Sequence, residues 1–138
     1  MTETNTNSKN DSKTRDATGA SSTGVKYEID ATGRKVGRLA TEIAHILMGK
    51  NMPDFEKHVV ADVEVTVTNV SKIDLPQRKA DGKIYTRYTG FPGGLRKESA
   101  AKLAARRGHS ELLKRAVYGM LPGNRLRKPR MKRLTITE

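Results

Sequence analysis

The sequence predicts a single α/β domain, and two features of the chain support this. Its 138 residues leave room for one ordinary domain. Strand-like and helix-like segments alternate along it, and the first three are a strand, a helix and a strand. Such a β-α-β unit makes a right-handed crossover between parallel strands, so we expect a largely parallel sheet.

A polar leader precedes this domain. Residues 1–24 include ten Ser or Thr and almost no large apolar side chain. Such a composition cannot bury enough surface to become ordered, so we expect a disordered tail at 1–24 and a folded domain at 25–138. The leader has neither the apolar core of a signal peptide nor the Arg-rich, acid-poor composition of an organelle transit peptide.

The first half of the domain is predicted from two periodicities. Residues 25–30 form a short strand, and a turn follows at 31–33. Apolar residues then recur at helical spacing, which predicts a helix over 35–48 that ends at Gly49. From residue 59 the period changes to two, which predicts the next strand. The apolar residues of these patterns are Val36, Leu39, Ala40, Ile43, Ile46 and Leu47 in the helix and Val63, Val65 and Val67 in the strand.

The second half begins with a turn at Asp81-Gly82 and a strand over 84–89. Gly90, Pro92, Gly93 and Gly94 predict a loop. Two helices follow, one over 98–107 closed by Gly108, and one capped by Ser110 that ends near Leu121. A basic segment and a short strand over 134–137 complete the prediction.

The charge of the chain points to a polyanionic partner. Lys and Arg number 27 against 15 Asp and Glu, which gives a net charge of +12. Residues 1–24 hold three basic and three acidic side chains, so the whole excess lies in the domain. The absence of cysteine excludes a disulfide framework, a thiolate zinc site and a catalytic thiol. No apolar run is long enough to predict a membrane span.

Three segments carry the cations that best suit a nucleic-acid backbone. Arg34, Lys35 and Arg38 surround the start of the first helix, where backbone amides also attract phosphate. Arg87, Arg96 and Lys97 flank the glycine-rich loop. The densest run has six basic side chains in nine residues, with no acidic residue between Leu112 and Thr137: Arg125, Arg127, Lys128, Arg130, Lys132 and Arg133. A solvated basic surface is the alternative in each case.

Stacking on unpaired bases is not expected as the main binding mode, because the chain has two Phe, four Tyr and no Trp. Recognition of phosphates and of folded RNA shape is favoured.

Catalysis has little support, since His45, His58 and His109 lie far apart and outside known catalytic motifs. His58 is a candidate for a phosphate contact or for a structural hydrogen bond. The turn at 32–38 lacks the glycine spacing of nucleotide-binding loops.

Several motifs, taken in order, resemble the family of large-subunit ribosomal protein thirteen, of the bacterial type. The resemblance covers nearly all of residues 26–135. The motifs that carry it are Asp30-Ala31-Thr32-Gly33 before Val36-Gly37-Arg38-Leu39-Ala40-Thr41, Leu47-Met48-Gly49-Lys50, Asn69 with Lys72-Ile73, Thr89-Gly90-Phe91-Pro92-Gly93-Gly94-Leu95, and Ala116-Val117-Tyr118-Gly119-Met120-Leu121-Pro122 before Asn124-Arg125-Leu126.

The resemblance implies a three-layer domain with a largely parallel sheet of about four strands flanked by helices. It implies a structural protein that binds 23S-type rRNA, abuts other large-subunit proteins, supports early subunit assembly and works in the bacterial cytoplasm, with no enzyme activity, cofactor, metal or small-molecule substrate. Lys50 and His58 join the RNA contacts predicted above. Two other hypotheses stay open: a regulatory protein that binds messenger RNA, and a small nucleotide-dependent enzyme.

Overall fold

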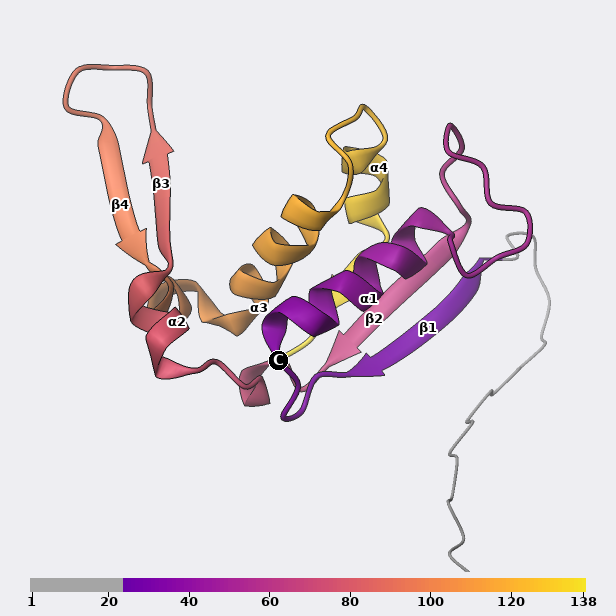
Figure 1. Cartoon of the computed structure of the whole chain (residues 1–138), viewed down its shortest axis with the longest axis horizontal. Coiled ribbons are helices and arrows are strands. Elements are labelled where there is room, and N and C mark those ends of the chain that lie inside the picture. Colours follow the sequence, from indigo (N-terminus) through magenta and orange to yellow (C-terminus); the bar gives the residue numbers. More distant parts are fainter. Residues whose placement is uncertain (1–23) are drawn as a thin grey trace, which may run out of the picture.

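A computed structural model describes residues 24–138, and its centre is a parallel three-stranded sheet (Figure 1). The strands are β1 (Val25–Asp30), β2 (Val63–Thr68) and β5 (Leu134–Ile136), in the order β1-β2-β5. Helix α1 (Val36–Met48) connects β1 to β2, so the predicted β-α-β unit is confirmed. The predicted disordered tail, residues 1–24, lies outside the described residues except for Gly24.

Helix α1 forms where the apolar spacing predicted it. Its apolar stripe is buried, and Gly49 ends the helix in the left-handed conformation, with φ of 80°. The Gly49 N–H donates to the carbonyl of Ile46 at 2.9 Å, which satisfies one of the carbonyl groups left open at the helix end. The helix therefore stops early enough for the chain to return to the start of β2.

The core lies between the sheet and two helices, α1 and α3 (Ala100–Met120), which run side by side in Figure 1. Leu39 and Ile43 of α1 and Leu113 and Val117 of α3 pack in one cluster with the alternate valines of β2. A fully buried side chain of this kind stabilises a fold by about 1.5–3 kcal/mol. This cluster supplies the rigid body from which the basic segments project.

The other face of the sheet is polar. Lys26 and Glu28 of β1 and Glu64 of β2 are exposed, and they alternate with the buried residues as the two-residue period requires. The α/β class, the single domain and the parallel sheet are confirmed. Within residues 24–138 the long helices α1 and α3 pack on the same face of the sheet. The three-layer arrangement that the resemblance implied would place helices on both faces.

Helix α3 contains the predicted break at Gly108, whose φ of 80° and ψ of 169° are not helical. The helix was expected to start at residue 98; Ser99 is its N-cap, and the Ser99 Oγ accepts from the backbone N–H of Lys102 at 3.4 Å. Ser110 does not cap a separate helix by its side chain. Its backbone N–H donates instead to Oε1 of Glu138 at 3.3 Å.

The remaining elements follow the prediction in part: strands form where they were expected over 84–89 and 134–137, and the other elements differ. Strand β3 (Ile84–Tyr88) pairs antiparallel with β4 (Leu95–Ser99), and together they form a separate hairpin that projects from the body (Figure 1). The central sheet therefore has three strands, and not about four. The turn expected at Asp81-Gly82 is instead the end of a helix, α2 (Gln77–Gly82), and most of the basic segment forms α4 (Arg127–Lys132). A short 3₁₀ turn, η1 (Val70–Lys72), follows β2.

Candidate nucleic-acid interface

The β3–β4 hairpin places two like charges opposite each other. Arg87 and Arg96 are directly paired in the antiparallel register, and Lys97 follows on the other face, opposite Thr86. All three cations are exposed, and none makes an ion pair within residues 24–138. Like charges placed directly opposite destabilise a hairpin. An anion placed between the two guanidinium groups would relieve that repulsion.

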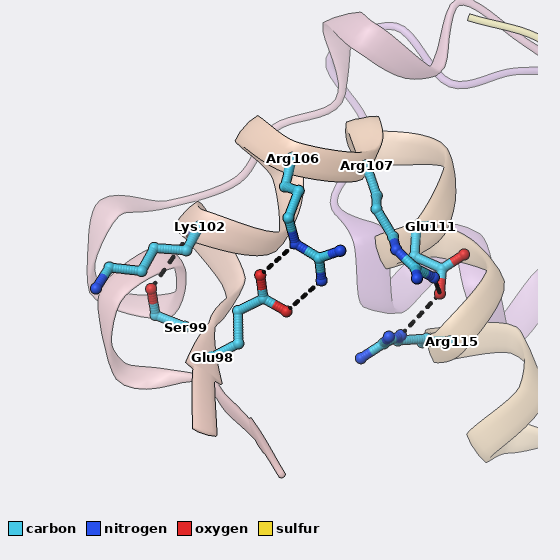
Figure 2. A network of polar contacts seen from close by, with 7 residues as sticks. All are labelled: Glu98, Ser99, Lys102, Arg106, Arg107, Glu111 and Arg115. Atoms are coloured by element: carbon cyan, nitrogen blue, oxygen red, sulfur yellow. Dashed lines mark hydrogen bonds and ion pairs between the residues drawn. The ribbon is translucent and has the colours of Figure 1, made fainter. Parts of the chain in front are cut away.

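A polar network holds the base of this hairpin against α3 (Figure 2). Arg106 donates from Nε and Nη2 to the two carboxylate oxygens of Glu98, at 2.9 and 2.7 Å. These hydrogen bonds lower the pKa of Glu98 and raise that of Arg106. Arg115 donates to Glu111 at 3.0 Å, and its guanidinium lies 5.1 Å from the centre of the Tyr85 ring. The hairpin is therefore linked to α3 through both of its strands.

The basic segment at 125–133 divides into exposed and engaged side chains. Arg125, Lys128 and Lys132 are exposed and form no ion pair within the described part of the chain. Arg133 is engaged in an ion pair with Asp62. Arg127 donates to two backbone carbonyl groups and stacks over Tyr118. Three of the six predicted cations are thus open to a partner.

Arg130, one of the predicted RNA contacts, is buried in the protein. Its side chain is only 2% exposed, because Arg130 lies on the face of α4 that packs against the rest of the protein. The Nη2 atom lies 3.4 Å from the carbonyl oxygen of Val59, and Nε is buried without a hydrogen-bond partner. An RNA phosphate cannot reach this guanidinium without moving the surrounding chain.

At the start of α1, Arg34 is paired with Glu42, whereas Lys35 and Arg38 are exposed. The turn before them is fixed by Asp30, whose carboxylate accepts from the Thr32 backbone at 3.0 Å and the Thr32 hydroxyl at 2.8 Å. These hydrogen bonds lower the pKa of Asp30. The exposed cations Lys35 and Arg38 therefore follow a turn whose backbone is held in place by hydrogen bonds.

The predicted contacts do not form one patch. In Figure 1 the tip of the β3–β4 hairpin, the loop before α4 and the loop after α1 project toward the upper edge of the view. The start of α1 lies at the lower edge. Lys50 and His58 belong to the loop after α1, where both are exposed and His58 Nε2 lies 3.4 Å from Glu56. The arrangement suits several RNA segments and not a single groove.

Other chemistries receive no support from the geometry of the described residues. The hollow beside Lys35 and Gly37 has a volume of about 40 Å³, which is too small for a nucleotide. Within residues 24–138 no group of three or more His, Asp or Glu is placed to hold a metal ion. None of the helices described is long and apolar enough to cross a membrane.

One feature of the interface was missed in the sequence. Tyr118, on the last turn of α3, lies under the guanidinium of Arg127, 4.5 Å from ring centre to Cζ. The two residues are separated by the break at 122–124, and no local pattern relates them. Their proximity follows from the fold of the loop that joins α3 to α4.

Comparison with known proteins gives one consistent result. Residues 25–138 match the model of a family described as ribosomal protein L13. The chain is 44% identical over 110 residues to a large ribosomal subunit protein uL13 from Rubrobacter xylanophilus, covering 80% of this chain and 76% of the relative. It is 46% identical over 109 residues to the protein of the same name from Thermus thermophilus, covering 78% and 76%.

Proposed function

The chain belongs to the ribosomal protein L13 family, and from this premise we propose that it binds 23S-type rRNA and supports early assembly of the large subunit. It is a structural constituent of that subunit in the bacterial type of ribosome, and its family is not one of enzymes. Its partners are rRNA and neighbouring large-subunit proteins.

The uncompensated cations on projecting segments carry the proposal. Arg87 and Arg96 face each other on the hairpin, and two further exposed cations are Arg125, just before α4, and Lys128, in its first turn. In the isolated protein, opposed like charges repel each other and destabilise the hairpin. A phosphate bound between them removes this repulsion, and the counterions that had neutralised the phosphate are released, which favours binding. The buried core keeps these segments at fixed separations, which suits pinning of distant RNA segments.

Salt titration of binding to large-subunit rRNA fragments tests this function. A multi-phosphate interface predicts that log affinity falls steeply with log salt, by about 0.7–0.9 per phosphate contact. The variant that changes Arg87, Arg96, Arg125 and Lys128 to Gln should lose about three units of that slope. Lys26→Gln is the control, because the Lys26 ammonium already lies 3.6 Å from Glu64. A flat slope for the unaltered chain would reject the proposal.

An order-of-addition experiment tests the assembly role. Large subunits are reconstituted with this protein present from the start or added after the other proteins, and the particles are sedimented. An early role predicts that late addition leaves slower-sedimenting precursors. Full recovery on late addition would show that the protein joins a finished core.

A further inference from the structure

An open hollow lies between the end of α3 and the start of α4. Its volume is about 340 Å³, and Tyr118, Gly123, Asn124, Arg125, Arg127 and Lys128 line it. Ligand sites in proteins begin at about 300 Å³, so the hollow has room for a small planar group and not for a duplex. Three of the six lining residues are cationic, and one is aromatic.

The guanidinium of Arg127 is held in place at this hollow. Its Nε donates to the Pro122 carbonyl at 3.1 Å and its Nη2 to the Leu121 carbonyl at 2.9 Å. One face of the guanidinium lies over the Tyr118 ring, 4.5 Å from its centre. Within residues 24–138 Nη1 has no hydrogen-bond partner. The plane is therefore fixed before any ligand arrives, with one nitrogen still able to donate.

Glycine at position 123 keeps this guanidinium accessible. A Cβ at Gly123 would come within 3.2 Å of Nη2 of Arg127. Any side chain there would crowd the guanidinium or cover it. The residue that follows, Asn124, is exposed, and its amide can both donate and accept at the edge of a planar ligand.

We propose that this hollow binds one unpaired nucleotide of RNA, with its base stacked on the Arg127–Tyr118 pair. The inference rests on the proposed function and adds a base contact to an interface otherwise made to phosphates. Asn124 hydrogen-bonds the edge of the base, and Arg125 and Lys128 neutralise the flanking phosphates. A phosphate alone would contact the three cations but would make no contact with the flat surface of the stacked Arg127–Tyr118 pair.

Four variants of the full chain separate stacking from charge. Tyr118→Leu removes the ring, Tyr118→Phe keeps it, Arg127→Lys keeps the charge without the plane, and Asn124→Ala removes the edge contact. Base stacking of this kind predicts that Tyr118→Leu weakens binding to large-subunit rRNA fragments by about 5- to 150-fold with an unchanged salt slope. Arg127→Lys should weaken binding in the same way, Asn124→Ala less, and Tyr118→Phe hardly at all. Lys114→Gln, an exposed neutralisation on α3, is the matched control.

Chemical probing of the bases in the same complexes supplies the second readout. One or a few unpaired nucleotides should lose reactivity with the unaltered protein and regain it with Tyr118→Leu. Equal affinities and identical reactivity maps for Tyr118→Leu and Tyr118→Phe would overturn the stacking site while salt-sensitive binding keeps the proposed function. No rRNA binding by the unaltered chain would reject both. If Tyr118→Leu lowers the Tm, the reactivity map of Asn124→Ala, whose side chain makes no internal hydrogen bond within residues 24–138, decides between the outcomes.

Discussion

Arg106 on α3 and Glu98 on β4 are joined by two parallel hydrogen bonds, of 2.9 and 2.7 Å, across the base of the projecting hairpin (Figure 2). A forked contact of this kind fixes direction as well as distance. The pair therefore sets the angle at which Arg87 and Arg96 leave the body. A change at the base of the hairpin should alter binding at its middle.

Replacing Glu98 with Gln should make the stability difference from the unaltered protein depend on pH. The Arg106 hydrogen bonds lower the pKa of Glu98 below its ordinary 4.5. A lowered folded pKa stabilises the fold above the unfolded value, and that contribution is lost as pH falls through the folded pKa. Thermal unfolding should thus give Glu98→Gln a lower Tm than the unaltered protein at pH 7, and this Tm difference should shrink as the pH falls below 4.5.

The control for this prediction is Glu64→Gln, whose partner Lys26 lies 3.6 Å away with both side chains largely exposed. Such a pair contributes little. A Tm difference for Glu98→Gln that stays constant from pH 7 to pH 3 would contradict the role assigned to the Glu98 carboxylate.

Two glycines of the first helical region should respond oppositely to alanine. Gly49 has φ of +80°, and a Cβ there would lie 2.6 Å from Cβ of Ala61. Gly37 lies in α1, and a Cβ added there would have no other atom within 4 Å outside its own helix backbone and chain neighbours. Gly49→Ala should lower the free energy of unfolding by more than about 1 kcal/mol. Gly37→Ala should raise it by about 0.5 kcal/mol, because alanine restricts the unfolded chain. Urea denaturation measures both, and equal effects would show that the helix does not end as described.

Replacing Arg130 with Met should stabilise the protein and spare RNA binding. Arg130 is 2% exposed with an unsatisfied Nε, and an apolar side chain of similar length removes that buried polar group. The free energy of unfolding should rise by about 1 kcal/mol. Affinity for rRNA fragments should stay within twofold, whereas Arg125→Gln should reduce it. A loss of affinity in Arg130→Met equal to that in Arg125→Gln would support the RNA contact that the sequence predicts for Arg130.

The sequence predicted those elements whose formation depends on their own pattern. Helix α1 and strand β2 have regular apolar periods, and Gly49 marks the helix end by itself. Strand β4 reads Leu-Arg-Lys-Glu-Ser and has no strand pattern; it is extended because β3 pairs with it. Helix α4 contains Pro129, which suggests a break. Pro129 is the third residue of α4, where a helix has no internal acceptor for the N–H that proline lacks.

The candidate site shows the same division. Charge density identified the segments at 87–97 and 125–133, because an excess of cations can be seen in the sequence without knowledge of the fold. It could not separate Arg130, which turns inward, from Lys128 and Lys132, which are exposed. It also could not relate Tyr118 to Arg127, since that stack exists only after the loop between the helices has closed. Tertiary contacts decide these roles.

Charge reversal at Arg96 should separate stability from binding. Arg96→Glu places a carboxylate directly opposite Arg87 on the same face of the hairpin. A cross-strand attraction then replaces a repulsion, which should raise the free energy of unfolding by about 0.2–1 kcal/mol. The same change removes one phosphate donor and repels its phosphate, so affinity for rRNA fragments should fall at least about tenfold at low salt and the salt slope should shrink by about one or more. Arg96→Gln should lie between the two proteins in both measurements. A protein that is more stable yet binds RNA less well is the pattern expected of residues kept for a partner, and unchanged affinity in Arg96→Glu would show that the opposed arginines do not face RNA.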